Sequence, residues 1–273
     1  MTTGADDFYG WSGIWVSPDG AELIGVEGGT WVRARLSYDA DGNLAGFAPT
    51  AAGRLHDERG QPLAEGDDSD AEALDFDGTD FLVGFETNDR VMRYRDLDGP
   101  GIPLPIPQSI IETIFRGTGF SSVAALEDGS ILAIPEYAYV NAEDRQAGAP
   151  FKTIPTRGWM ETSHGGGPVS LRAALPSLPV SLVALPNGDL LTVEVHLLED
   201  LSIDRAEIGV ASRDEARIGG MLNPRRIATL AEPMPAWRIE GSAARKGAGE
   251  TLIYLLSTSS PPVLYMFELK SGD

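Results

Sequence analysis

A hairpin that recurs five times along the chain constrains the fold more than any other feature of this sequence. Each copy consists of an apolar strand, a short turn that contains glycine, and a second apolar strand. Four of the turns contain Asp-Gly or Asn-Gly, which favours the left-handed backbone that tight hairpins need. The copies span residues 12–27, 70–86, 121–136, 179–195 and 238–257.

The spacing of the copies indicates how many strands each can hold. Successive turn glycines lie 58, 51, 59 and 61 residues apart, at Gly20, Gly78, Gly129, Gly188 and Gly249. A period of this size holds one four-stranded antiparallel blade and its loops. The sequence therefore predicts one all-β domain over residues 1–273, a single β-propeller of about five blades. Residues 201–230 leave room for a sixth, degenerate blade, and a β-sandwich or an open solenoid is the alternative fold.

The turns also predict the outer strands. Second turns at 41–42 and 98–99 follow the first hairpin in two copies, so outer strands are expected at 30–38, 43–55 and 90–95. One short helix is predicted over 108–115. The last copy supplies three strands, the third at 263–269, and we expect a strand near residues 8–11 to complete the ring. Closure matters because open sheet edges invite aggregation.

Charge and composition exclude several classes of function. The chain has 41 acidic and 21 basic residues, a net charge of −20, which argues against binding to nucleic acid. It has no cysteine, so thiol nucleophiles, disulfides and cysteine-based zinc sites are excluded. No apolar run approaches the roughly 20 residues of a membrane span. The first residues lack the features of a signal peptide, so a cytoplasmic location is expected unless a signal has been removed.

Acidic side chains recur at the ends of the hairpins. Glu27, Glu86, Glu136 and Glu194 follow their turn glycines by 7, 8, 7 and 6 residues. Equivalent positions in successive blades form a ring around the propeller axis, so these carboxylates are expected to share one mouth of the channel if they point inward. Carboxylates that lie so close raise one another's pKa or bind a cation, and calcium accepts six to eight oxygen ligands.

Acids at the starts of the first strands extend this candidate site from a neighbouring level. The predicted calcium ligands are Glu27, Asp70, Glu72, Glu136 and Glu240. Arg90, four residues after Glu86, is a candidate clamp for a phosphate or carboxylate group. Because side chains alternate between the faces of a strand, the alternative is that these glutamates face solvent or pair with arginines such as Arg90.

The histidines and tryptophans give weaker evidence of a functional site than the acidic residues do. His56, His164 and His196 do not have the spacing of a zinc motif. Ser163 is adjacent to His164, but a catalytic pair also needs an orienting acid. The five tryptophans are expected to pack between blades rather than to bind sugar.

Several segments, taken in order, resemble a known family. They are SGIWVSPDG at 12–20, DAEAL at 70–74 with FETNDR at 85–90, LEDGSILAIPE at 126–136, LPNGDLLTVE at 185–194, and the closing strands of 238–270. This set is similar to the bacterial phytase-like propellers, described by an esterase-like activity of phytase. The resemblance implies a secreted or periplasmic propeller and a calcium-dependent hydrolase of phosphoester or ester bonds.

Three functions remain open at this point. In the first, a metal-assisted hydrolase, Glu72 or Glu86 would serve as ligand or base and Arg90 would bind the substrate. In the second, the propeller binds a small ligand or a protein without catalysis, which Ser181 and Val195 favour because charged residues are usual there in the family. In the third, two channel carboxylates hydrolyse a glycoside. Each places a small molecule or ligand at the channel mouth, and none predicts an oligomeric state.

Overall fold

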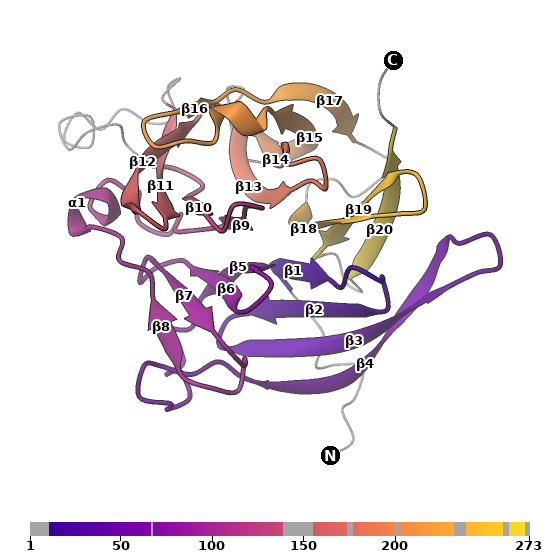
Figure 1. The fold of residues 1–273 in the computed structure, drawn as a ribbon, viewed down its shortest axis with the longest axis horizontal. Helices are drawn as coiled ribbons and strands as arrows, with labels where there is room; N and C mark the ends of the chain where they lie inside the picture. The colour runs from indigo at the N-terminus through magenta and orange to yellow at the C-terminus, as the bar shows by residue number, and fades with distance from the viewer. Residues whose placement is uncertain are drawn as a thin grey trace.

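The computed structural model describes residues 11–66, 68–138, 155–173, 177–199, 202–231, 239–258 and 262–270. Five small sheets surround a common axis as the blades of a propeller (Figure 1). The predicted all-β fold with five blades is therefore confirmed, and the sandwich and solenoid alternatives are wrong. No helix of the described residues is long and apolar enough to cross a membrane.

Blades 1 and 2 are antiparallel sheets with their strands in chain order. Blade 1 contains β1 (Gly13–Val16), β2 (Glu22–Glu27), β3 (Thr30–Tyr38) and β4 (Leu44–Arg54). Blade 2 contains β5 (Ala71–Phe76), β6 (Phe81–Phe85), β7 (Arg90–Tyr94) and β8 (Gly101–Pro103). The predicted outer strands of both blades agree with β3, β4 and β7 to within one residue at each end. Helix α1 (Gln108–Ile111) is shorter than the predicted 108–115.

Blades 3 to 5 are less regular. Blade 3 contains β9 (Ser122–Ala125), β10 (Ile131–Ile134), β11 (Thr156–Thr162) and β12 (Gly165–Leu171), with β16 (Met221–Leu222) added in parallel. Blade 4 contains β13 (Ser177–Ala184), β14 (Leu190–Leu197), β15 (Ile203–Ala211) and β17 (Arg225–Leu230). Blade 5 contains β18 (Ile239–Lys246), β19 (Thr251–Ser257) and β20 (Val263–Leu269). The sixth blade considered for residues 201–230 is wrong, because that segment supplies β15, β16 and β17 to blades 3 and 4.

The first strand of every blade lies next to the axis. Each of these strands packs against the first strands of two other blades, in the cyclic order β1, β5, β9, β13, β18 (Figure 1). The ring is therefore closed by β18 against β1. The prediction that residues 8–11 add a closing strand falls mostly outside the described residues; Trp11 is described and lies just before β1.

The apolar core lies between neighbouring blades. One cluster joins blades 5 and 1 around Trp11 and Tyr254, and another joins blades 1 and 2 around Trp31 and Phe85. Trp11 and Trp31 belong to these clusters and are at most 7% exposed, as expected for tryptophans that pack between blades, and Trp15 packs against the second cluster. Trp159 is buried but belongs to neither cluster, and Trp237 lies outside the described residues. The core therefore holds the blades at a set distance around the axis.

The junctions between inner strands leave no room for a side chain. A Cβ atom on Gly13 of β1 would lie 2.6 Å from the carbonyl carbon of Ala73 in β5. A Cβ atom on Gly241 of β18 would lie 2.5 Å from the carbonyl oxygen of Ser12. Both neighbours are backbone atoms, so they cannot move aside without shifting a blade.

We predict that Gly13→Ala and Gly241→Ala each lower the free energy of unfolding by about 1–3 kcal/mol, the usual cost of overpacking. Gly249→Ala is the matched control, because nothing lies within 4 Å of its Cβ position and its φ is not positive. Urea unfolding measures all three variants. Equal stability of the two junction variants and the control would contradict this account of the ring.

Candidate functional site

A cavity of about 310 Å³ opens at one mouth of the channel. Blades 2, 3 and 5 contribute polar side chains to its wall, and blade 4 contributes most of the apolar ones. The polar residues are Glu72, Glu86, Ser121, Glu136 and Glu240, and the apolar residues are Leu178, Val180, Val195, Leu197, Ile203 and Ile239. The acidic part of the wall therefore comes from blades 2, 3 and 5, and the apolar part comes mostly from blade 4.

Three carboxylates of blade 2 come together at this mouth. Asp70, Glu72 and Glu86 each offer one oxygen, and these oxygens all lie within 4.8 Å of one another. Asp70 directly precedes β5, Glu72 lies within β5, and Glu86 directly follows its hairpin partner β6. The backbone N–H of Glu86 donates to the carbonyl oxygen of Asp70 at 2.8 Å, which holds the two ends together.

A β-bulge directs Glu72 into the cavity. Ala71 pairs with Phe85 and Ala73 with Gly84, so Glu72 is the extra residue of the bulge. Such an extra residue is unpaired and its side chain is re-aimed. The same irregularity recurs in blades 4 and 5, where Val180 and Glu240 are the extra residues. All three line the cavity, so the bulge is the device that presents one inner-strand side chain of each of these blades to the mouth.

The acids of the mouth are held in an environment that disfavours their charge. Burial raises the pKa of Glu72 to about 8, and the charges of Glu240, Asp70 and Glu136 add to the rise. Burial and the neighbouring carboxylates, Glu136 foremost, raise the pKa of Glu86 strongly. The pKa of Glu136 is raised by burial and by Glu240.

Glu27 belongs to the same electrostatic group, although it does not line the cavity wall. Its pKa is raised to about 7, first by burial and then by Glu240. Glu240 itself accepts hydrogen bonds from Thr258 Oγ1 at 3.1 Å and from Ser12 Oγ at 3.4 Å. The predicted ligands Glu27 and Glu240 therefore lie at the side of the mouth where blade 5 meets blade 1.

No ion pair among the described residues involves Glu72, Glu86 or Glu136. Half-buried carboxylates that lie close together without a positive partner retain protons or bind a cation. The donors are all oxygen atoms, which suits a hard cation such as calcium. The residues present thus fit the predicted ion.

Asp89 is a member of this group that the sequence did not single out. Burial raises its pKa to about 6, and its charge contributes to the raised pKa of Glu86. Its Oδ1 atom is buried and has no hydrogen-bond partner among the described residues. Its position three residues after Glu86, next to Arg90, was the only signal in the sequence.

Arg90 does not point at the carboxylates. Its guanidinium lies 4.0 Å from the ring centroid of Phe85. It donates to the carbonyl oxygen of Asn88 at 2.9 Å and to the carbonyl oxygen of Asp68. Its role as a clamp for a substrate anion stays a prediction.

Glu194 lies apart from the acids of the mouth. It lines a separate cavity of about 230 Å³ with Glu207, to which it is paired in register, whereas its neighbour Val195 lines the channel cavity. In the second strand of each hairpin, the positions of Gly84, Ile134 and Val193 are equivalent. Glu86 and Glu136 lie two residues after this position. Glu194 lies only one residue after it. One residue reverses the face of a strand, so the ring expected from the turn spacing is incomplete.

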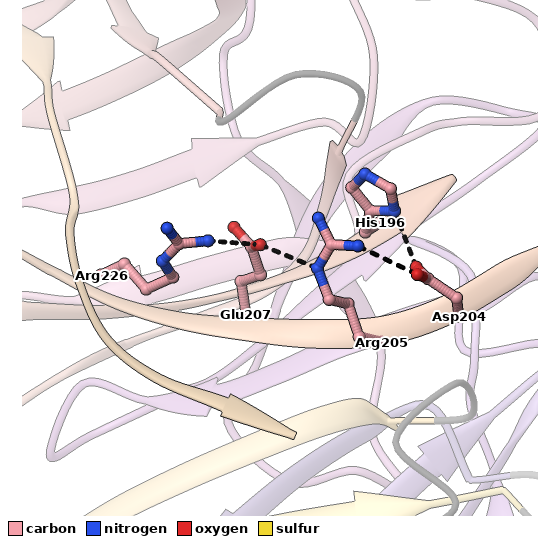
Figure 2. Close-up of polar contacts among 5 residues, drawn as sticks. All are labelled: His196, Asp204, Arg205, Glu207 and Arg226. Carbon is pink, nitrogen blue, oxygen red and sulfur yellow. Dashed lines mark hydrogen bonds and ion pairs between the residues drawn. The ribbon is translucent and has the colours of Figure 1, made fainter. Parts of the chain in front are cut away.

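Glu207 shows how the chain neutralises a buried acid elsewhere. Its Oε1 accepts from Arg226 at 2.7 Å and from Arg205 at 3.1 Å (Figure 2). Arg205 also pairs with Asp204, and Asp204 in turn contacts His196.

Ser163 and His164, considered above as a pair, are hydrogen-bonded at 2.9 Å on an exposed turn.

Comparison with known proteins agrees with this architecture. The family model "Phytase-like: Esterase-like activity of phytase" matches residues 6–257. The chain belongs to the phytase-like family. Sequence comparison with curated proteins gave no match.

Solved structures similar to this phytase-like propeller share its fold at low sequence identity. A thermostable family-43 glycoside hydrolase has a TM-score of 0.55 and 12% identity, over 97% of this chain and 91% of the other. An endo-arabinase from Bacteroides thetaiotaomicron has a TM-score of 0.53 and 12% identity, over 100% of this chain and 99% of the other. Identities this low show a common fold and no more.

The raised pKa values make a prediction about the stability of this phytase-like propeller. An acid whose pKa is higher in the folded state stabilises the fold below its unfolded pKa, and this contribution is lost as pH rises through the folded pKa. For Glu72 and Glu27 the loss extends from about pH 5 to about pH 8. We therefore expect Tm, measured by scanning calorimetry with a chelator, to fall across this range.

The variant Glu72→Gln should have a flatter dependence of Tm on pH than the wild type, because it removes one of these titrating groups. Glu127→Gln removes an equal charge at an exposed turn and should keep the wild-type slope. A Tm that rises from pH 5 to pH 8 would contradict the charge-disfavouring environment of the mouth.

Proposed function

We propose that this protein is a calcium-dependent hydrolase of phosphoester or ester bonds, with its site at the acidic mouth of the channel. The observation that carries the proposal is the triad Asp70, Glu72 and Glu86, whose carboxylate oxygens lie within 4.8 Å of one another. The description of the family, esterase-like activity of phytase, supports the same class of reaction. A secreted or periplasmic location agrees with it, since extracellular modules bind calcium at about 10⁻⁴–10⁻³ M.

The residues of blade 2 would hold the ion, and Glu136, Glu240 and Glu27 would surround it. Bound calcium supplies a Lewis acid that polarises a phosphoryl or carbonyl oxygen. Asp70 is oriented for this role because one of its oxygens accepts a hydrogen bond from Thr87 at 2.9 Å.

Glu136 is placed to move a proton. Burial and the charge of Glu240 raise its pKa, and a general base is most effective when its pKa lies near the working pH. Its carboxylate lines the cavity beside Glu86. We propose that Glu136 takes a proton from the attacking water, while Glu72 and Glu86 act as ligands.

The apolar wall of blade 4 would bind the organic part of the substrate. Leu178, Val180 and Leu197 line the same cavity as the acids. A cavity of about 310 Å³ is at the small end of the usual range for ligand pockets, roughly 300–1,000 Å³. A small ester or phosphoester is thus favoured over a polymer.

A binding propeller without catalysis is the second candidate. Blade 4 favours it, because Val180 occupies the bulge position that is glutamate in blades 2 and 5. Val195 likewise occupies the position of Glu86 and Glu136. A glycoside hydrolase remains a third candidate, since several channel carboxylates line one cavity and two glycosidases share the fold.

We predict that calcium raises Tm in a thermal melt and that EDTA reverses the rise. At a calcium concentration 100 times Kd the gain is about 2.7 kcal/mol, which amounts to about 5 °C for a chain of this size. Glu86→Gln should abolish most of the rise and the control Glu127→Gln should keep it. A wild-type melt that calcium does not move would remove the metal-dependent proposal.

Release of p-nitrophenol from phosphate, acetate and arabinoside substrates separates the three candidates. We expect calcium-dependent release from the phosphate or the acetate, and a loss of about 100-fold or more in kcat for Glu136→Gln, the usual contribution of a positioned base. Activity on the arabinoside alone would favour the glycosidase. A calcium-bound protein that is inactive on all three would favour the binding propeller.

A further inference from the structure

Thr87 has the most unusual backbone conformation at the mouth. Its φ of 63° makes it the single non-glycine residue with a positive φ in the part of the chain that the structure describes. A β-branched residue in this region is strained by roughly 1–3 kcal/mol. Such strain persists only where the surroundings enforce it, and it concentrates at functional sites. Thr87 directly follows Glu86, so its conformation sets the direction in which the chain leaves that carboxylate.

The strain arises from a very tight turn centred on Thr87. The backbone N–H of Asn88 donates to the carbonyl oxygen of Glu86 at 2.6 Å, which closes a three-residue turn around Thr87. Turns of this kind with a positive φ at the centre are rare and strained. The turn reverses the chain at once after β6 and keeps Glu86 beside the start of β5.

The side chain of Thr87 acts on a second member of the triad. Its Oγ1 donates to Oδ2 of Asp70 at 2.9 Å. A hydroxyl donor to a carboxylate fixes the rotation of that carboxylate and occupies one of its lone pairs. Thr87 therefore contacts Asp70 through its side chain and adjoins Glu86 through its backbone.

Neighbouring residues lock the turn in place. Asn88 Nδ2 donates to Asp68 Oδ1 at 2.6 Å, and the guanidinium of Arg90 joins the carbonyl oxygens of Asn88 and Asp68. These bonds connect the segment after β6 to the segment before β5. Relaxation of Thr87 to an unstrained conformation would have to break several of them.

We propose that Thr87 is a positioning residue, whose strained turn and hydroxyl hold Asp70 and Glu86 at the spacing that a divalent cation requires. The inference rests on the proposed function, in which Asp70, Glu72 and Glu86 bind that cation. The fold tolerates an unfavourable backbone conformation, and the cation site gains two ligands that are oriented before the ion arrives. Removing such outer partners of ligands typically weakens metal binding by about 10–100-fold.

Three variants separate the effect of the Thr87 hydroxyl on calcium binding from the effect of the backbone strain. Thr87→Ser keeps the hydroxyl, Thr87→Val keeps the branched shape without the hydroxyl, and Thr87→Gly removes the hydroxyl and also the strain. Thr79→Val is the matched control, because Thr79 lies in the exposed turn between β5 and β6. Calcium alone is titrated into each full-length protein by calorimetry, and Tm is measured in EDTA.

We expect Thr87→Val and Thr87→Gly to weaken calcium binding by about 10-fold or more. Thr87→Ser and Thr79→Val should bind calcium within about 3-fold of the wild type, because both keep a hydroxyl at position 87 that can donate to Asp70. In EDTA, Thr87→Gly should melt no lower than the wild type, because it relieves the strain. A residue with a merely structural role would change Tm and leave the calcium Kd unchanged.

The outcomes distinguish the two proposals. If the wild type binds calcium and all three Thr87 variants bind it equally well, the positioning role of Thr87 is overturned and the cation site stands. If the wild type binds no calcium, the proposed function fails and this inference fails with it. Should Thr87→Val not fold, the comparison of Thr87→Ser with Thr87→Gly decides the same question.

Discussion

The side-by-side packing of the five inner strands is the constraint on which the rest of this structure depends. At Gly13 and Gly241 backbone meets backbone so closely that no side chain fits between the blades. The ring therefore has little freedom in how its strands rotate about their own axes. Bulges at Glu72, Val180 and Glu240 interrupt the ladders of three inner strands and turn these side chains toward the cavity, whereas Glu86 and Glu136 line it from beyond the ends of their strands. The acidic chemistry of the mouth thus depends on bulges and strand ends in an otherwise regular ring.

The charges of a buried acid and of a half-buried acidic group are compensated in opposite ways in this molecule. Glu207 is neutralised by Arg205 and Arg226, so its burial is compensated within the protein (Figure 2). Glu72, Glu86 and Glu136 have no such partners in the described residues, and burial raises the pKa of each. A chain with 21 basic residues could place one of them here. Because none of the described basic residues pairs with these acids, their negative charge is compensated by protons or by an ion from solution.

The sequence predicted most of the fold because its signals were local. Asp-Gly and Asn-Gly turns recur with the period of a blade, and Gly20, Gly78, Gly129 and Gly188 do adopt the positive φ that those turns require.

The site was less predictable from the sequence, because it depends on the register of the strands. Glu194 and Glu86 follow their turn glycines by similar numbers of residues, yet hairpins of different loop length place them on opposite faces. A bulge has no reliable signature in a single sequence, so the inward direction of Glu72 and Glu240 was a hypothesis that residue order alone could not decide. The turn at Thr87 has no glycine or asparagine at its strained position, and nothing in the sequence marks it.

The asymmetry of the mouth limits which substrates fit the proposed reaction. Acids from blades 2, 3 and 5 line the cavity together with aliphatic side chains that come mostly from blade 4. A highly charged substrate such as a polyphosphorylated sugar would have to place some anionic groups against aliphatic carbon, without the hydrogen bonds that buried charges need. A monoester with one polar head and one apolar group can contact the acidic and the apolar parts of the wall without that cost. In this proposal Val180 and Val195 have a function of their own, because they provide the surface that would bind the apolar part of such an ester.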